Sequence, residues 1–492
     1  MEQYDIIIIG GGVVGCMTAR ALSRFNLKIL LVEKESDIGM GASSANSAIV
    51  HAGHDPYPGT LKAEMNRLAN PMWDEVSAEL GIPFRRSGAY IVAVGPDECG
   101  CLESLLERGH ENRVPIEMIS GEEMLRREPL LNPQVSGALY TPTAGMVDPF
   151  AACIAPLENA IENGVEVMTG TAFTDFIVQD NKISGIRTNR GDFGCHWVVN
   201  AAGVYSDEVM HKAGVRPEFK INTRRGEYYI LDSTEIEMSN ILFPVPTGVS
   251  KGILVFGSTH GNVLVGPNSQ EAPDKEDKAV TAKGLSEIWQ SAQKLVPSIT
   301  PRAIIGVFAG MRASGNATCK VCGIDYHHDF VIERAEEVEG LINLAGIESP
   351  GLTSAPAIAE RVVELLKDAG VSMAVRKDWN PIRKARPRFN HLSRKEQAEL
   401  VGRDARYGRV VCRCEMITEG EIVAEIHAPI PARTYDAIKR RTWLGTGRCL
   451  GSFDMPRVVE LLSHELGIPV TEVTKKGPGS EFLVRPTKEV EA

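Results

Sequence analysis

The sequence predicts an α/β fold that begins with a dinucleotide-binding unit, and three stretches carry this prediction. Residues 4–22 (YDIIIIGGGVVGCMTARAL) combine a β-branched run, a glycine-rich turn and a helical pattern. Residues 27–34 (LKILLVEK) form a second apolar run, and residues 341–366 repeat the order of strand, glycine turn and long helix. Short apolar runs before such turns are typical of parallel strands covered on both faces.

The first turn holds a G-x-G-x-x-G motif at Gly10, Gly12 and Gly15. The first glycine permits the tight turn, the second lets a pyrophosphate approach the backbone, and the third lets the helix pack close to the strand. At Val13 and Val14 the helix begins, and its N-terminus offers N–H groups and a partial positive charge to phosphates. The motif therefore predicts a bound dinucleotide.

Glu33 follows Gly15 by 18 residues, at the end of the second predicted strand. A carboxylate there can accept hydrogen bonds from both hydroxyls of an adenosine ribose, and it disfavours a 2′-phosphate. Lys34 comes next and is also expected at the cofactor. This unit by itself leaves FAD and NAD open.

Three later segments favour FAD. Residues 39–53 (GMGASSANSAIVHAG) are rich in small and hydroxyl side chains, which suits a loop along a pyrophosphate and a flavin ring. The strand in 197–207 ends in small residues, and the helix within 341–366 would aim its positive end at the flavin pyrimidine, where reduction builds negative charge. The cofactor-binding residues predicted here are Ala42, Ser43, Ser44, Asn46, Ser47, Ala201, Ala202, Gly203, Gly351, Leu352 and Thr353.

Length and composition narrow the class of protein. A chain of 492 residues suffices for two or three domains, and a net charge of -11 argues against a nucleic-acid partner. No apolar run reaches the roughly 18 residues of a membrane span, and residues 1–12 lack the basic segment of a signal peptide. Ten cysteines without an export signal indicate free or metal-bound thiols. We expect a cytoplasmic protein, with peripheral contact at the inner face of the membrane left open.

Residues 1–370 resemble the D-amino-acid-oxidase superfamily of FAD oxidoreductases, in the branch of glycerol-3-phosphate dehydrogenase and L-2-hydroxyglutarate oxidase. The matching segments are GGGVVGCMTARAL, HAGHDPYPGTLKAEM, GIPFRRSGAYIVA, VVNAAG, KGILVFGSTHGNVLVGP and ESPGLTSAPAIAE. The resemblance implies a Rossmann-like FAD-binding domain with a mixed β-sheet substrate domain inserted between its pieces. The FAD-binding domain would take residues 1–90, 145–220 and 325–372, and the substrate domain residues 91–144 and 221–324.

The resemblance also implies a reaction. The superfamily oxidises a C–H bond beside a hydroxyl or an amine and passes hydride to the flavin. We expect an FAD-dependent dehydrogenase of a small anionic 2-hydroxy compound, with sn-glycerol 3-phosphate, giving dihydroxyacetone phosphate, as the leading substrate. Oxidation of L-2-hydroxyglutarate, of a secondary amine or of an amino acid is one alternative. An electron-transfer subunit of a larger flavoprotein complex is another.

Four residues are candidates for the substrate chemistry. His51 follows the flavin-loop segment, and an imidazole can act as a base or orienting donor near neutral pH; His54 is a weaker alternative. Lys62, at the start of a predicted helix, would contact an anionic group. Arg312 resembles the arginine that the superfamily places over the flavin, where a guanidinium suits carboxylate or phosphate. His260, on a predicted hairpin, is expected to face the pocket. For each of them a purely structural role stays open.

Two other groups of residues are less suggestive. Tyr228 and Tyr229 are more typical of sheet residues than of ligands. Cys319 and Cys322 form a C-x-x-C pair with histidines beyond it, which suggests a metal or redox pair. Because no second C-x-x-C accompanies them, we interpret them as unpaired thiols in a loop.

The residues after 372 are predicted to form a separate unit. Proline and basic residues indicate a linker at 373–405, followed by a small helical domain at 406–492. Thr418 and Glu421 have the spacing of a capping box at a helix start. The predicted helices span 418–428, 434–442 and 455–467.

The cysteines of this helical domain resemble the ligands of the bacterioferritin-associated-ferredoxin-like [2Fe–2S] module. Cys412, Cys414 and Cys449 match its pattern, and Asp454 stands at the fourth position. Thiolates are the usual ligands, and a carboxylate would weaken the site or alter its potential. An empty helical module, another metal and cysteines that are only buried hydrophobes remain open as alternatives.

A cluster in this domain would have a clear use. It would pass electrons singly from the flavin to an acceptor protein or a quinone-linked subunit, which favours a dehydrogenase over an oxidase that reduces oxygen directly. We also expect an oligomer, of a size that the sequence does not give.

Overall fold

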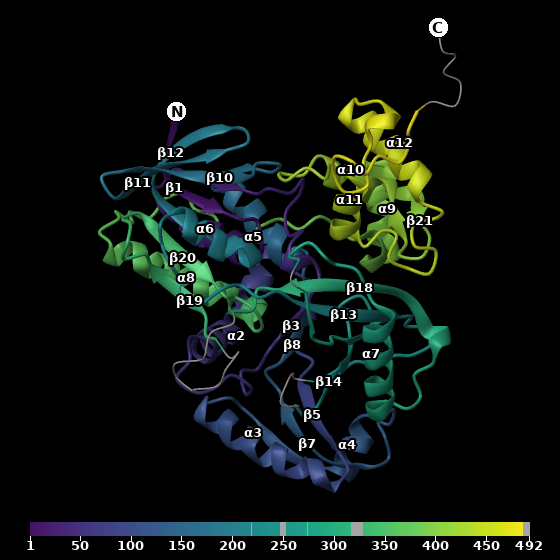
Figure 1. Ribbon diagram of the computed structural model, residues 1–492. Coiled ribbons are helices and arrows are strands. Elements are labelled where there is room, and N and C mark those ends of the chain that lie inside the picture. The colour runs from purple at the N-terminus through teal and green to yellow at the C-terminus, as the bar shows by residue number, and fades with distance from the viewer. Residues whose placement is uncertain (218, 247–251, 273, 316–327, 486–492) are drawn as a thin grey trace.

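The computed structural model describes residues 1–217, 219–246, 252–272, 274–315 and 328–485, and two large sheets organise it (Figure 1). The first sheet, with the helices on its faces, is called the first domain. Strands β1, β2, β12 and β20 are parallel, whereas β10, β11 and β19 pair antiparallel to their neighbours. The strands of this sheet are β1 (Glu2–Ile9), β2 (Ile29–Val32), β9 (Glu166–Met168), β10 (Phe173–Gln179), β11 (Lys182–Thr188), β12 (Gly191–Asn200), β19 (Val331–Arg334) and β20 (Leu341–Ala345).

Helices cover both faces of the first sheet. Ile6 and Ile8 of β1 point into one core, with α1 (Val13–Leu22), α2 (Leu61–Leu80), α5 (Ala151–Glu162) and α8 (Gly351–Asp368). Ile7 and Ile9 point into a second core, on the side of α6 (Ser206–Lys212). Alternate side chains of a strand face opposite sides, so a strand buried on both faces must be apolar throughout. The prediction from the β-branched run is confirmed.

Within the described residues, the second domain is built on a mixed sheet of nine strands. Strand β14 pairs parallel with β5, and the other pairings are antiparallel. Ala89 and Tyr90 belong to this sheet, two residues ahead of the predicted boundary. The strands are β5 (Ala89–Val94), β6 (Glu117–Ser120), β7 (Val135–Thr141), β13 (Arg224–Leu231), β14 (Ile241–Pro244), β15 (Leu254–Gly257), β16 (Val263–Gly266), β17 (Gln270–Glu271) and β18 (Ile304–Arg312); α3 (Cys99–Glu111), α4 (Gly121–Arg127) and α7 (Ala282–Leu295) accompany them. A small sheet of β3 (Ile49–Val50), β4 (Phe84–Arg85) and β8 (Gly145–Val147) lies between the two domains.

The last part of the chain forms a tail domain, drawn in yellow in Figure 1. It has a core of its own, in which Ile422, Ile438, Val458 and Leu462 are buried together. The predicted capping box is confirmed, because the side chain of Thr418 and that of Glu421 each bond the other residue's backbone N–H. The domain contains α9 (Arg394–Arg403), β21 (Val410–Cys412), β22 (Ile417–Thr418), α10 (Glu419–Ile426), α11 (Tyr435–Thr442) and α12 (Met455–Leu466). Helix α9 lies in the stretch predicted as linker.

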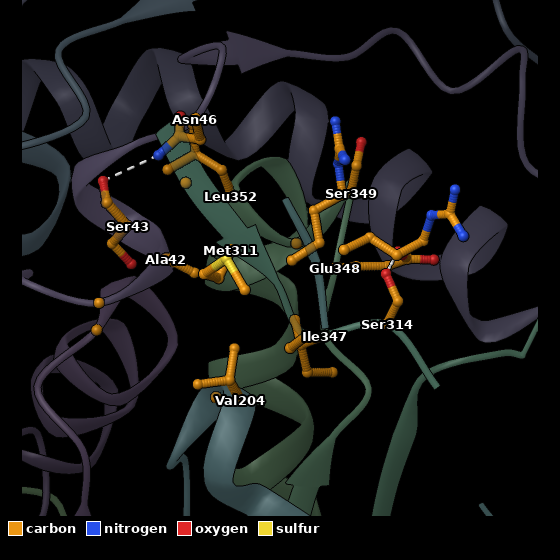
Figure 2. A pocket seen from close by; sticks show the side chains of 18 of the residues that line it. Ala42, Ser43, Asn46, Val204, Met311, Ser314, Ile347, Glu348, Ser349 and Leu352 are labelled. Atoms are coloured by element: carbon orange, nitrogen blue, oxygen red, sulfur yellow. Dashed lines mark hydrogen bonds between the residues drawn. The ribbon is translucent and has the colours of Figure 1, made fainter. Parts of the chain in front are cut away.

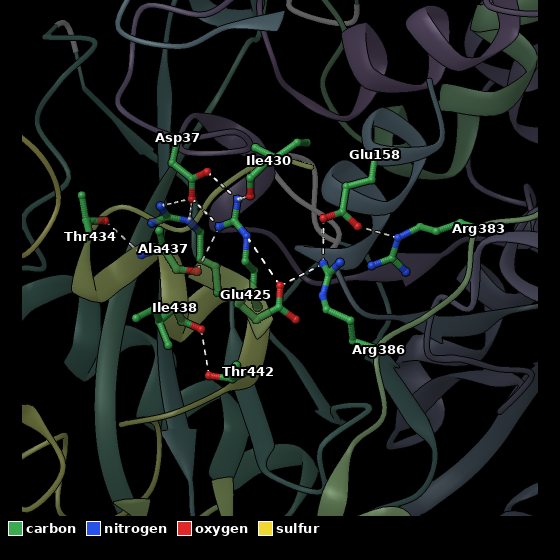
Figure 3. A network of polar contacts seen from close by, with 12 residues as sticks. Asp37, Glu158, Arg383, Arg386, Glu425, Ile430, Thr434, Ala437, Ile438 and Thr442 are labelled. Carbon is green, nitrogen blue, oxygen red and sulfur yellow. Dashed lines mark hydrogen bonds and ion pairs between the residues drawn. The ribbon is translucent and has the colours of Figure 1, made fainter. Parts of the chain in front are cut away.

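Buried ion pairs join the tail domain to the first domain (Figure 3). Asp37, 2% exposed, receives hydrogen bonds from both Arg440 and Arg441 of α11, with closest approaches of 2.6 and 2.8 Å. Arg386, from the linker stretch, bridges Glu158 of α5 at 2.7 Å and Glu425 of α10 at 2.9 Å. These contacts hold the tail domain against the first domain at two places.

None of the helices in the described ranges combines the length and the apolar composition that crossing a membrane requires. Cys319 and Cys322 fall in 316–327, outside the described residues.

Candidate functional site

A cavity of about 1230 Å³ lies between the first and second domains, with walls from both (Figure 2). Sites for drug-sized ligands usually enclose about 300–1,000 Å³, so this space exceeds what a small substrate needs. Met311 of β18, with Ile347 and Leu352 from the segment before and within α8, gives it an apolar region. The size suits a dinucleotide together with a substrate.

The glycine turn has the geometry that the motif requires. Gly10 has φ +109°, and a Cβ on it would collide with the carbonyl of Ala201. A Cβ on Gly15 would collide with the carbonyl of Gly10, so this glycine lets α1 pack onto β1. Gly12, by contrast, lines the cavity, and a Cβ there would meet only the Ser43 hydroxyl, at 3.3 Å. The backbone of the turn therefore lines the cavity at the start of α1, where Ser43 Oγ accepts from Val13 N–H at 3.0 Å, and this position fits a pyrophosphate.

Glu33 lies at the same end of the cavity and is held by backbone groups. Its Oε2 accepts from Gly11 N–H at 2.7 Å and its Oε1 from Glu35 N–H at 2.8 Å. Burial raises its pKa despite these bonds. Lys34 also lines the cavity, with Nζ 2.9 Å from Glu276 Oε1 and over the ring of Tyr205. The carboxylate is thus fixed in place with lone pairs left for a ligand.

Most of the predicted cofactor residues line this cavity, and three do not. Gly15 contacts the β1 turn, and the Ser44 hydroxyl donates to Gly41 C=O at 2.8 Å. Thr353 is buried, and its Oγ1 accepts from His51 N–H at 2.9 Å. These three support the cavity wall and do not face it. Those that line it are Gly10, Gly12, Val13, Val14, Glu33, Lys34, Ala42, Ser43, Asn46, Ser47, Ala201, Ala202, Gly203, Gly351 and Leu352.

His51 is held firmly by its backbone and presents its ring to the cavity. Its C=O accepts from the side-chain amides of Asn66 at 3.1 Å and Asn70 at 2.9 Å, and its N–H is bound by Thr353. The ring Nε2 lies 3.4 Å from the hydroxyl of Ser349, which also lines the cavity. An imidazole positioned in this way can take or give a proton at a bound substrate.

Lys62 reaches the cavity wall, but its charge is already paired. Its Nζ lies 2.8 Å from Glu348 Oε1, and the Ser314 hydroxyl also bonds Glu348 (Figure 2). Burial alone would raise the pKa of Glu348, but its interactions with Lys62, His328 and the Ser314 hydroxyl together lower that pKa to about 2. Lys62 also lines the cavity, so its contact with the substrate's anionic group stays a prediction; in the structure its ammonium is paired with Glu348.

Arg312 shares its end of the cavity with a second arginine. Strands β13 and β18 pair so that Arg224 lies directly opposite Arg312, and both side chains line the cavity. Arg312 Nη2 donates to Asn268 C=O at 2.8 Å, and Arg224 Nε donates to Ser269 Oγ at 2.8 Å. Among the described residues no carboxylate lies within ion-pair distance of Arg312, and Glu271 is 3.7 Å from Arg224. The two guanidinium groups create a positive site for an anion.

Sequence reasoning missed Arg224, Glu348 and Ser349. Arg224 starts a strand, and only the strand register places it beside Arg312. Glu348 and Ser349 lie in a segment that was recognised as part of the family pattern, but their neighbours were unknown. Tyr228 is a sheet residue stacked on Phe308 at 4.5 Å, and it also lines the cavity, with its hydroxyl 3.1 Å from Ser47 Oγ.

His260 lies elsewhere, so the expectation that it faces the pocket is wrong. Its Nε2 is 3.1 Å from Asp148 Oδ2, and its ring centroid is 3.8 Å from that of Trp443 in the tail domain. Trp443 Nε1–H donates to the same Asp148 oxygen at 2.9 Å. The hairpin that carries His260 points at the contact between domains. His54 is buried beside Phe243, outside the lining of the main cavity.

The four predicted metal-binding residues lie in two pairs in the tail domain. Cys412 faces Asp454, and burial first, then this carboxylate, raises the pKa of Cys412 to about 11. Cys414 contacts Cys449, whose backbone N–H also bonds the Cys414 sulfur. Within the part of the chain that the structure describes, no three His, Cys, Asp or Glu side chains converge on a single ion.

Backbone groups surround the two pairs. Gly445 and Glu415 direct N–H groups at the Cys412 sulfur, and a Cβ on Gly447 would collide with Cys414. In a two-iron group each iron takes two protein ligands, and N–H groups near sulfur are typical of such sites. The donor set of three thiols and a carboxylate, in two pairs beside the turn that contains Gly445 and Gly447, therefore fits a two-iron group better than a single metal ion.

Comparison with known proteins decides the family. Residues 5–365 match the family model described as FAD dependent oxidoreductase (DAO), and residues 410–463 match the BFD-like [2Fe-2S] binding domain. The chain belongs to the DAO family of FAD-dependent oxidoreductases. These two matches confirm the predicted family, the FAD cofactor and the [2Fe–2S]-type tail domain.

Relatives within the DAO family are similar over long spans. The chain is 42% identical over 490 residues to a glycerol 3-phosphate dehydrogenase of Caloramator mitchellensis, and the alignment covers 99% of both chains. It is 33% identical to a glycerol 3-phosphate oxidase of Mycoplasma genitalium, over 77% of this chain and 98% of the relative. The first of these alignments therefore takes in the tail domain together with the rest of the chain.

Two solved structures share the fold of this chain. The FAD-bound, dithionite-reduced L-α-glycerophosphate oxidase of Mycoplasma pneumoniae superposes with a TM-score of 0.72 at 33% identity, over 79% of this chain and all of that one. Glycine oxidase of Bacillus cereus superposes with a TM-score of 0.65 at 21% identity, over 74% of this chain, and shows the fold alone.

Proposed function

We propose that this chain oxidises sn-glycerol 3-phosphate to dihydroxyacetone phosphate and delivers the electrons to an acceptor other than oxygen. The observation that carries the proposal is the placement of Arg224 and Arg312 side by side in the cavity to which His51 also presents its ring. Two adjacent guanidinium groups suit a dianionic phosphate better than one carboxylate. The relative that matches over the whole length, at 42% identity, is a glycerol 3-phosphate dehydrogenase.

In this proposal each group has a defined task. Arg224 and Arg312 hold the phosphate, and His51 takes the proton from the substrate's C2 hydroxyl while Ser349 orients its ring. Bound FAD supplies the two-electron acceptor for the hydride that leaves C2. Loss of that proton and that hydride turns the secondary alcohol into a ketone, so atoms and electrons balance. The residues of the glycine turn, with Glu33, hold the adenosine and pyrophosphate end.

The nature of the acceptor is supported by which relatives share the tail domain. The dehydrogenase aligns with 99% of this chain, whereas the oxidase of Mycoplasma genitalium aligns over nearly its own full length with only 77% of it. A [2Fe–2S]-type domain that is held firmly against the first domain suits electron transfer to a protein or a quinone-linked subunit. Oxygen would need no such domain.

Anaerobic reduction of the bound flavin tests the substrate. We expect sn-glycerol 3-phosphate to bleach the flavin absorbance, and L-2-hydroxyglutarate and L-proline to leave it unchanged over the same time. Arg312→Met and Arg224→Met should each weaken substrate binding, whereas Arg187→Met, an exposed arginine on β11, should not. Faster bleaching by L-2-hydroxyglutarate than by glycerol 3-phosphate would overturn the proposed substrate.

A further inference from the structure

Asp454 is buried at a helix start and yet does not cap the helix. It occupies the N-cap of α12, where an aspartate normally accepts hydrogen bonds from the first backbone N–H groups. Its side chain makes no such bond, although the residue is only 1% exposed. Its Oδ2 has no hydrogen-bond partner at all among the described residues. A buried carboxylate oxygen without a partner is costly, so this oxygen points to a ligand that the protein atoms do not supply.

The other oxygen of Asp454 is held by a tyrosine. The hydroxyl of Tyr435 donates to Asp454 Oδ1 at 2.5 Å, and both residues are buried. The phenol fits here because two glycines make room for it: a Cβ on Gly445 would lie 2.5 Å from the Tyr435 oxygen, and one on Gly451 would lie closer still. Gly445, in the same glycine-rich turn, also directs its N–H at Cys412. The Tyr435 bond therefore occupies Oδ1 and leaves Oδ2 available, in a carboxylate that faces Cys412.

We propose that Asp454 Oδ2 is an iron ligand of the tail domain and that Tyr435 is the positioning residue that keeps Asp454 monodentate. Cys412 and Asp454 bind one iron of a two-iron group, and Cys414 and Cys449 bind the other. The pairing of the four side chains supports this division. The inference goes beyond the proposed function, since it concerns no substrate and no reaction at the cavity.

The assignment predicts a cluster with unlike irons. One iron has two thiolates, and the other has a thiolate and a harder oxygen ligand. A hydrogen bond from Tyr435 withdraws negative charge from Asp454, and hydrogen bonds to ligands tune the reduction potential. Removing the phenol hydroxyl should therefore lower the midpoint potential. Replacing the carboxylate by a thiolate should make the two irons more alike.

The experiment uses the full-length protein, reconstituted anaerobically with iron and sulfide and reduced with dithionite. Reduction by dithionite separates the result from the substrate proposal, because it needs no turnover. The variants are Tyr435→Phe, Asp454→Cys and Asp454→Asn. Tyr407→Phe is the matched control, because it removes another buried phenol hydroxyl of the same domain, whose ring packs on Gly420. Flavin content of each variant reports that the chain is folded.

Wild-type protein should bind two irons and two sulfides per chain, with two distinct iron environments in the Mössbauer spectrum of the oxidised protein, recorded before dithionite is added. Asp454→Cys should keep the iron and bring the two environments together, and Asp454→Asn should lose iron to a chelator faster than the wild type. Tyr435→Phe should keep the iron but lower the midpoint potential, whereas Tyr407→Phe should change neither. Full retention of the wild-type spectrum in Asp454→Asn would remove Asp454 from the ligand set, as would a reconstituted protein without iron. An unchanged potential in Tyr435→Phe would remove the role of Tyr435.

Discussion

Charged side chains are used in opposite ways in the cavity and at the contact between the tail domain and the first domain. Arg224 and Arg312 in the cavity are partly exposed and bond mainly to a backbone carbonyl and to serine. At the domain contact, Arg441 is 4% exposed, and its charge and that of Arg440 converge on one carboxylate, Asp37 (Figure 3). The part of the cavity around Arg224 and Arg312 thus keeps positive charge available, whereas the domain contact neutralises it.

This difference separates binding from structure. A cation in a cavity that has no carboxylate partner, as for Arg312, or only a distant one, as for Arg224, can attract an anionic ligand because the protein leaves its charge largely unpaired. A buried ion pair contributes little net stability to the protein. Removing one partner, however, destabilises the protein strongly, because the remaining charge is left buried and unpaired. We therefore expect changes in the cavity to affect catalysis and changes at the contact to affect folding.

Replacement of His51 tests the catalytic side of the comparison. His51→Gln should lower kcat/KM for glycerol 3-phosphate by about 10²- to 10⁴-fold, the usual range for loss of a general base. Bound flavin and the unfolding midpoint should stay as they are. His54→Gln is the control, since His54 is buried outside the lining of the main cavity. Steady-state kinetics and flavin content measure both. Equal losses in the two variants would argue for a structural role of His51.

Replacement of Asp37 tests the structural side. Asp37→Ala leaves two buried arginines facing each other and should lower the free energy of unfolding by about 3–5 kcal/mol. Glu339→Ala breaks an exposed pair with Lys182 and should cost about 1 kcal/mol or less. Denaturant unfolding of both variants gives the comparison. Adding Arg441→Met to Asp37→Ala should recover part of the loss, and no recovery would contradict the charge argument.

The same aspartate should make the contact sensitive to acid. Burial alone would raise its pKa, but Arg441 and then Arg440 outweigh burial and lower it from 3.8 to about 2. A lowered folded-state pKa gives stability that is present above pH 3.8 and is lost as the pH falls towards 2, about 2 kcal/mol in all. The unfolding free energies of wild type and Asp37→Asn, measured against pH, should converge over that interval. Parallel curves would mean that Asp37 does not titrate this way.

The structural features that could be predicted from the sequence depend on interactions between residues close together in the chain. The roles of Gly10 and Gly15, the placement of Glu33 and the capping box at Thr418 follow from spacing along one strand, turn or helix. These features are determined by residues close together in the sequence and by backbone geometry, so they can be predicted from the sequence alone.

The parts that it missed depend on contacts between distant segments. Arg224 joins Arg312 only through the register of β13 and β18. His260 was assigned to the pocket because its hairpin belongs to the second domain, but Trp443 and Asp148 draw that hairpin to the domain contact. No local pattern states which partner such a side chain will meet.

The smallest expected effect comes from the tail domain's capping box. Thr418 Oγ1 accepts from Glu421 N–H at 3.3 Å and donates to Glu421 Oε2 at 2.8 Å, within a buried helix start. Thr418→Ala should destabilise this domain by about 1 kcal/mol, as loss of an N-cap usually does. Ser393→Ala removes an exposed capping box at α9, a helix with no buried residues, so its effect should stay within that helix. Hydrogen exchange should therefore speed up across α10, α11 and α12 in the first variant and only across α9 in the second. If hydrogen exchange sped up equally in both variants, and only within the capped helix, burial of the capping box would not contribute to the stability of the domain.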